Sequence, residues 1–218
     1  MNRREFLKST AAMAALYGIG GCAGVCCSGK PRLGVQMFSV KDLWPKDLAA
    51  SFKELKSIGY EGVQGMYFWK NDRKELKAML DGNGLRLVDM PVSNDQLAPG
   101  KESEVVDFLR FFDIDFIYVP WAKFKTYDEW KKYADDLGKT AERFAKYGIK
   151  LGFYNHFHEL AENFGDEQIC SQEIIARVPN IQFELDIGRI QGAGADPVAW
   201  MKRLHGRVPT IHASPEGA

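Results

Sequence analysis

The spacing of hydrophobic positions changes repeatedly along the chain, from short strand-like runs to longer amphipathic stretches. Strand-type runs occur at 33–38, 61–65, 85–90, 115–119, 150–155, 181–187 and 208–212. Helical patterns separate them at 46–58, 71–81, 101–112, 126–147, about 166–178 and 196–204. In the first, Leu48, Phe52 and Leu55 recur at helical spacing, which predicts one buried face. Regular alternation of this kind predicts an α/β protein with a parallel sheet and helical crossovers.

The faces of the predicted strands distinguish a closed barrel from an open sheet. A central strand of an open sheet is apolar on both faces, because helices cover both. The run 181–187 instead alternates, with Ile181, Phe183 and Leu185 on one face and Gln182, Glu184 and Asp186 on the other. Helices outside a polar-lined interior produce this pattern, which favours a (β/α)8-type barrel. Edge strands of an open sheet remain the alternative at this point.

The first residues have the features of an export signal. Arg3 and Arg4 precede Phe-Leu-Lys and a short apolar stretch that ends at Cys22. We therefore expect a twin-arginine, lipoprotein-like signal at 1–21, a tether at 22–31 and the barrel domain at 32–218. The expected location is the periplasm, with membrane contact only through a lipid anchor on Cys22. Only Cys170 lies in the body, so no internal disulfide is expected there.

The charge balance excludes one class of partner. Lys and Arg total 29 and Asp and Glu total 29, so the formal net charge is zero. A neutral chain has no field that would gather nucleic acid. The 45% apolar content is that of a globular protein with a substantial core. We expect a small-molecule partner, and a homo-oligomer remains open.

Chemistry-bearing side chains follow three of the later predicted strands. His156 and Glu159 follow the run 150–155, Asp186 lies near the end of the run 181–187, and His212 ends the run 208–212. Barrels of this type place their sites at the carboxyl ends of the strands. Oxygen ligands with one nitrogen suit Mn, Co or Mg better than a structural zinc site. Singly, the Asp could cap a helix and each His could be a packing residue.

Several segments, in order, resemble the sugar phosphate isomerase/epimerases, which have a xylose isomerase-like TIM barrel. The resemblance runs from about 33 to 212. It rests on Leu33-Gly34-Val35-Gln36-Met37-Phe38-Ser39-Val40, Gly59-Tyr60-Glu61-Gly62-Val63-Gln64, Asn155-His156-Phe157-His158-Glu159, Glu184-Leu185-Asp186-Ile187-Gly188, Gln191-Gly192-Ala193-Gly194-Ala195-Asp196-Pro197 and Arg207-Val208-Pro209-Thr210-Ile211-His212.

This resemblance implies a metal-dependent isomerase or epimerase that abstracts a proton beside a sugar carbonyl and passes through an enediolate. It assigns a divalent metal, with Mn, Co or Mg favoured and Zn as an alternative, to Glu159, Asp186 and His212. The implied catalytic residues are Glu159 and His156. The implied substrate-binding residues are Asn155, Glu184, Trp121 and Gln64, although Trp121 could equally be a packing residue at the rim.

The chain also departs from the family pattern. Gln64 stands where the family usually has Glu, and Tyr154 stands where it usually has His. After His212 the sequence continues only through 213–218, so we expect about seven strands and six helices and a barrel that lacks its last βα unit. A second Glu ligand would then be absent and the chain itself could be inactive. The alternatives are an exported keto-glycoside lyase or hydrolase on the same barrel, and a non-catalytic sugar-binding barrel.

Overall fold

The computed structural model describes residues 32–42, 47–65 and 68–215. The predicted signal at 1–21 and the tether at 22–31 lie outside the described residues. Residues from Gly34 onward form one unit, which contains every element considered below.

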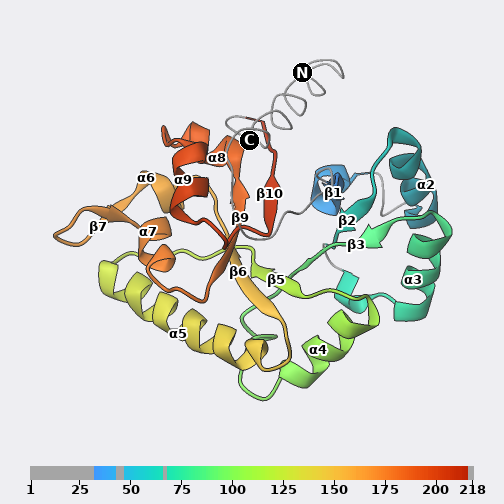
Figure 1. Cartoon of the computed structure of the whole chain (residues 1–218), viewed down its shortest axis with the longest axis horizontal. Helices are drawn as coiled ribbons and strands as arrows, with labels where there is room; N and C mark the ends of the chain where they lie inside the picture. The colour runs from blue at the N-terminus through green and yellow to red at the C-terminus, as the bar shows by residue number, and fades with distance from the viewer. Residues whose placement is uncertain (1–31, 43–46, 66–67, 216–218) are drawn as a thin grey trace, which may run out of the picture. The chain divides into compact units, whose positions relative to one another are not determined.

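In the part of the chain that the structure describes, eight short parallel strands carry the fold (Figure 1). They belong to two sheets, ordered β1-β2-β3 and β10-β9-β6-β5-β4. Their bounds are β1 Gly34–Gln36, β2 Gly62–Gln64, β3 Arg86–Leu87, β4 Met90–Pro91, β5 Phe116–Val119, β6 Lys150–Tyr154, β9 Gln182–Asp186 and β10 Thr210–His212. Each lies within two residues of a predicted strand, and the prediction at 85–90 contains both β3 and the start of β4.

The two sheets are continuous through the segment that holds β3 and β4. Val88 N donates to Val63 O at 2.9 Å, which ties the first half of this segment to β2. Val92 N donates to Tyr118 O at 2.9 Å, which ties the second half to β5. The strands therefore follow one arc from β1 to β10. Within the described residues β1 and β10 end this arc without pairing, so the expected incomplete barrel is confirmed.

The predicted helices lie along the outer side of the strands (Figure 1). They are α2 Leu48–Ile58, α3 Arg73–Gly82, α4 Glu102–Phe111, α5 Tyr127–Ala145, α7 Ser171–Ala176 and α9 Pro197–Arg203. Shorter turns of helix occur at η1 Met37–Val40, η2 Phe68–Lys70, α6 His158–Ala161 and α8 Ile187–Gly192. A capping box of Thr126 and Glu129 starts α5, and Gly59, with φ of 109°, ends α2 in the left-handed conformation that glycine allows.

One predicted helix starts later than expected. The pattern predicted a helix from about 166 to 178, but the segment begins with an antiparallel pair, β7 Asn163–Phe164 and β8 Ile169–Cys170. Gly165 and Gln168 have φ of 69° and 50°, and Gln168 N donates to Gly165 O at 3.2 Å. This tight turn reverses the chain, so the helix α7 forms only from Ser171.

The core lies between the helices and the outward faces of the strands, as the alternation predicted. Phe183 and Leu185 on β9 are fully buried in this core. Glu184 is on the opposite face, and its Oε1 accepts a hydrogen bond from Gln64 Nε2 on β2 at 2.6 Å. Because β2 and β9 belong to different sheets, these side chains meet across the interior of the barrel. None of the helices in the described residues is long and apolar enough to span a membrane.

Candidate functional site

Glu159 lies just beyond β6, in the short helix α6, and its side chain is fully buried. One carboxylate oxygen, Oε2, accepts a hydrogen bond from the backbone N–H of His156 at 2.7 Å. The other carboxylate oxygen, Oε1, accepts no hydrogen bond from the described residues. His158 Nε2 is 3.2 Å from Oε1, but this nitrogen is hydrogen-bonded to the carbonyl oxygen of Ala122 at 2.8 Å. Burial raises the pKa of Glu159 to about 7.

Asp186, the last residue of β9, is the most heavily bonded carboxylate of the site and is fully buried. Its Oδ2 accepts the Tyr154 hydroxyl proton at 2.5 Å, and Arg189 Nε lies 3.3 Å from the same oxygen. Its Oδ1 accepts from the Ser214 hydroxyl and, at 3.1 Å, from Arg189 N, so it caps α8. Asp186 N donates to Asn155 Oδ1 at 2.9 Å, which fixes the strand end.

His212 lies beside Asp186 because β10 and β9 pair in register at these two residues. His212 Nδ1 is 3.4 Å from Asp186 Oδ2 and 3.0 Å from the Tyr154 hydroxyl oxygen. Tyr154 gives its only proton to Asp186, so we assign the proton of neutral His212 to Nδ1, where it donates to the Tyr154 oxygen. Burial lowers the pKa of His212. The lone pair on Nε2 is then free to accept a proton or bind a cation.

Trp121 and His156 form the exposed side of this group. Trp121 follows β5 and its side chain is 52% exposed. Its ring centre lies 4.6 Å from that of His156 and 4.5 Å from that of His158. Burial, followed by the charge of Arg189, lowers the pKa of His156 to about 4, so this imidazole is neutral at pH 7. Asn155, His156, Glu159, Asp186 and His212 are called the mouth cluster below.

A second polar group lies deeper in the barrel. Gln64 on β2, Asp89 between β3 and β4, and Glu184 on β9 are 8%, 1% and 2% exposed. Each has a side-chain oxygen without a hydrogen-bond partner, namely Gln64 Oε1, Asp89 Oδ1 and Glu184 Oε2. Burial raises the pKa of Asp89 to about 7, opposed by a hydrogen bond from Gln64, and it also raises the pKa of Glu184. These three residues are called the floor cluster.

The structure therefore separates the predicted site residues into two layers. Asn155, His156, Glu159, Asp186 and His212 lie in the mouth cluster with Trp121 against it, whereas Gln64 and Glu184 lie in the floor cluster. Sequence reasoning missed Asp89, Arg189 and Ser214, and treated Tyr154 only as a departure from a family pattern. Asp89 was detectable, because it is a carboxylate within a predicted strand; the contact of Ser214 with Asp186 depends on the fold beyond β10.

Some of the predicted metal ligands have the right donor atoms for a divalent metal ion and lie close together. Asp186 and His212 lie together and combine a carboxylate with an imidazole whose Nε2 is free, and Glu159 has an unpartnered buried oxygen. In the described residues, however, no three or more His, Cys, Asp or Glu side chains form a group that could hold a metal ion. Asp186 and His212 thus fit as a pair, and Glu159 as the third ligand stays a prediction.

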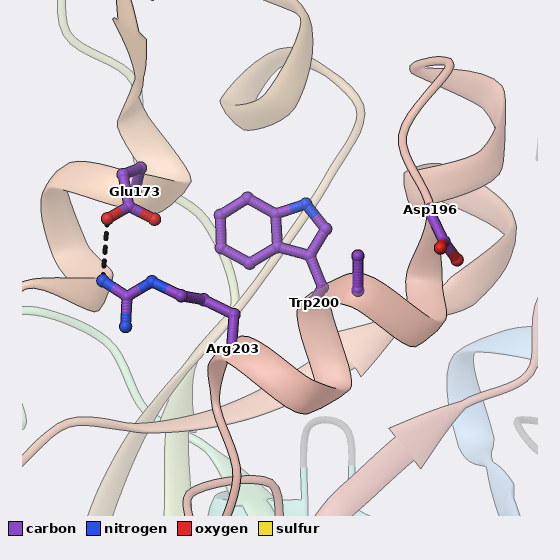
Figure 2. Close-up of a pocket in the computed structure, with 5 residues that line it drawn as sticks. Glu173, Asp196, Trp200 and Arg203 are labelled. Carbon is purple, nitrogen blue, oxygen red and sulfur yellow. Dashed lines mark hydrogen bonds and ion pairs between the residues drawn. The ribbon is translucent and has the colours of Figure 1, made fainter.

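A cavity of about 160 Å³ lies on the outer helices and not at the strand ends (Figure 2). Figure 2 shows Trp200 of α9 between Asp196 and the ion pair of Arg203 with Glu173, whose Nη2–Oε1 distance is 2.7 Å. The two acidic residues that line this cavity already have partners, since Glu173 pairs with Arg203 and Asp196 caps α9. The unpartnered polar oxygens of the interior make the barrel a better candidate.

Residues 52–215 match the model of the xylose isomerase-like TIM barrel family. The rhizopine catabolism protein MocC of Rhizobium meliloti is 29% identical over 85 residues, which are 39% of this chain and 25% of that protein. This match therefore spans about a quarter of the curated relative's length.

Among solved structures, a sugar phosphate isomerase/epimerase from Parabacteroides distasonis ATCC 8503 is similar, with a TM-score of 0.72 and 18% identity, over 87% of this chain and 77% of that one. The 3-keto-D-glucoside 4-epimerase of E. coli has a TM-score of 0.64 and 15% identity, over 86% of this chain and 80% of that one. At these identities the likeness shows the fold.

Proposed function

Because the chain belongs to the xylose isomerase-like TIM barrel family, we propose that it is a sugar isomerase or epimerase that removes a proton next to a carbonyl group. The observation that carries this proposal is Glu159, a fully buried carboxyl group with one unpartnered oxygen and a pKa of about 7. A general base works best when its pKa lies near the working pH.

The proposed step moves one proton and one electron pair. Glu159 Oε1 accepts the proton from the substrate carbon, and the C–H electron pair passes into the carbonyl group to give an enediolate. The backbone N–H of His156 holds the other carboxylate oxygen, so Oε1 stays directed at the substrate. Return of the proton by Glu159 to the former carbonyl carbon, with transfer of the hydroxyl proton between the two oxygens, gives an isomer. An epimer forms when a second donor, such as a water molecule, delivers a proton to the opposite face of the first carbon and Glu159 releases its proton to solvent.

The other mouth residues bind and orient the sugar in this proposal. His156 is neutral at pH 7, so its ring N–H can donate to a substrate oxygen without giving up a charge. Asn155 holds the end of β9 through Asp186 N and therefore positions the carboxylate next to it. Trp121 offers a half-exposed apolar face to the sugar ring. Small sugars or sugar derivatives are the expected substrates.

A divalent metal is typical of this family. In this chain Asp186 and His212 would hold it, with Glu159 as the predicted third ligand. When bound, a divalent cation would acidify the C–H group beside the carbonyl and stabilise the negative charge on oxygen. Tyr154 contacts both Asp186 and His212, so it orients these two side chains for a common ligand. Mn, Co and Mg stay the proposed ions.

Export is a separate proposal, supported by the sequence alone. The paired Arg3 and Arg4 and the apolar run before Cys22 support a twin-arginine signal and a lipid anchor on Cys22. The sugar chemistry would then take place in the periplasm.

The test of the proposed function is exchange of the carbon-bound proton with solvent. Keto sugars incubated in D₂O with the full chain and Mn²⁺ should gain deuterium beside the carbonyl, as measured by NMR. Glu159→Gln should lower the exchange rate about 100- to 10,000-fold, because it removes the general base. The control is Glu167→Gln, an exposed carboxylate that pairs with Arg177, which should exchange at the native rate. Undiminished exchange by Glu159→Gln would contradict the proposal.

A further inference from the structure

The floor cluster is rich in acceptors that no described residue satisfies. Gln64 Oε1, Asp89 Oδ1 and Glu184 Oε2 each lack a hydrogen-bond partner, and the three side chains are at least nine-tenths buried. Gln64 points to a ligand independently of the two acidic residues, because its side chain is neutral. Its Nε2 donates to Glu184 at 2.6 Å, and its Oε1 remains without a donor. A buried acceptor without a donor is costly, so an incoming donor group is strongly favoured here.

The charges around the floor cluster indicate what kind of donor fits. Burial is the main influence on both carboxyl groups, and the charges that act on Glu184 are those of Asp89 and Asp186. For Asp89, the other influence is the hydrogen bond from Gln64. Among the described residues, neither carboxyl group therefore has a Lys, Arg or His as a principal partner. This differs from the mouth, where Arg189 pairs with Asp186. A cation from outside would supply the missing charge.

We propose that the floor cluster binds the primary ammonium group of an amino sugar or amino polyol, with Asp89, Glu184 and Gln64 each accepting one N–H bond. An ammonium group has three donors and no acceptor, which matches the three unpartnered oxygens in number and in kind. A neutral hydroxyl group brings one donor and leaves the carboxyl groups without a counter-charge. Asp89 is thereby a specificity-determining residue of the site.

The position of the floor cluster allows one ligand to reach both layers. Glu184 and Asp186 are two residues apart on β9, so their side chains point to the same face, one above the other. Thr210 on β10 pairs with Glu184, and its hydroxyl oxygen also lacks a partner. A sugar whose carbonyl group lies at the mouth would direct a neighbouring substituent toward the floor. The inference rests on the proposed function, since it assumes that this mouth takes the sugar.

The experiment compares matched ligands by isothermal titration calorimetry with the full chain at pH 7, where the amino sugars carry their positive charge. The probes are D-glucosamine against D-glucose, and 3-amino-3-deoxy-D-glucose against D-glucose, so each pair differs by one ammonium group. At least one amino sugar should bind ten-fold or more tightly than its parent, because two carboxylates then pair with a cation. Equal affinity for amino and parent sugars, or no binding of any probe, would overturn the inference.

The variants assign the preference to the floor cluster. Asp89→Asn keeps the shape and removes one charge, so it should abolish most of the ten-fold preference while binding of the parent sugar persists. Gln64→Glu adds a third carboxyl group and should increase the preference. The control is Asp115→Asn, an exposed carboxylate paired with Lys150, which should keep the native preference. A preference that survives in Asp89→Asn would contradict the assignment.

The deuterium-exchange assay separates failure of this inference from failure of the proposed function. If a neutral keto sugar exchanges its proton but no amino sugar is preferred, the floor inference fails and the isomerase or epimerase proposal stands. If an amino sugar binds more tightly than its parent but no sugar exchanges its carbon-bound proton, the floor inference stands and the isomerase or epimerase proposal fails.

Discussion

Asp186 in the mouth cluster and the carboxyl groups of the floor cluster differ in how completely their oxygens are paired. At the mouth, Asp186 is contacted by Tyr154, Arg189, His212 and Ser214. On the floor, the described hydrogen bond joins Gln64 to Glu184, and Asp89 Oδ1 has no partner. Both groups are buried, so burial alone does not explain the difference. The contacts of Asp186 hold this carboxylate in one position, whereas the floor cluster offers unpartnered acceptors to a ligand.

The contrast also separates two physical ways to prepare a site. A carboxylate surrounded by donors is fixed in place. A carboxyl group that lacks a cation beside it gains a proton at a higher pH, as burial shows for Asp89.

The largest effect is expected from Asp186→Asn. The amide can still cap α8, but it loses the charge that Tyr154, Arg189 and His212 share. We expect kcat for deuterium exchange to fall about 1,000-fold, within the range of groups that orient or stabilise charge in a transition state.

Asp196→Asn is the matched control, because Asp196 caps the neighbouring short helix α9 and lies outside the two clusters. It should exchange at close to the native rate. Equal losses in both variants would mean that capping, and not the charge at the mouth, matters at Asp186.

The layers themselves follow from patterns that are local in sequence. The alternation of Phe183 and Leu185 with Glu184 and Asp186 places the carboxylates inside the barrel, and the structure confirms that arrangement. The turn at Gly165 and Gln168 was missed because the predicted helix was extended back to about 166, and a glutamine gives no sign in the sequence of the positive φ that Gln168 adopts. Short-range patterns thus predict strands, helices and the face on which a side chain lies better than they predict tight turns.

A change in pH should next reveal the buried carboxyl group of Asp89, which adds to the slope that Glu159 gives in the same direction. The folded pKa of Asp89 is about 7, above the ordinary value of 3.8, so the folded chain binds more protons than the unfolded chain between these values. The free energy of unfolding should therefore fall as pH rises from about 4 to about 7, by on the order of 2–4 kcal/mol from Asp89. Asp89→Asn should flatten this slope and be the more stable protein at pH 8.

Urea unfolding at pH 4.5, 6 and 8 measures this slope. Asp115→Asn, which removes an exposed carboxylate, should keep the native slope. If Asp89→Asn loses stability at pH 8, the carboxyl group is paired in the folded chain and the floor is not short of donors.

The pairing across the barrel interior was harder to predict from sequence than the facing of each strand. Gln64 and Glu184 are 120 residues apart and meet only because β2 and β9 face each other across the interior. Asp186 and His212 were expected together because parallel strands end at one rim, and their paired register bears this out. The roles of Tyr154 and Arg189 depend on side-chain direction at that rim, which spacing does not specify.

The smallest effect is expected from Trp121→Ala, at the exposed edge of the mouth. Trp121 is 52% exposed and its ring lies against His156 and His158, so its removal takes away a wall but no charge or proton donor to the reacting atoms. We expect KM for a keto sugar to rise about three- to ten-fold with kcat within about two-fold of native, since an aromatic contact contributes about 0.5–1.5 kcal/mol. Phe157→Ala is the control, because Phe157, in the turn after β6, is also an aromatic residue that is about half exposed, at 49%. This variant should leave KM unchanged. A KM that does not move in Trp121→Ala would place this ring among the packing residues of the rim and leave binding of the sugar to the polar groups of the two layers.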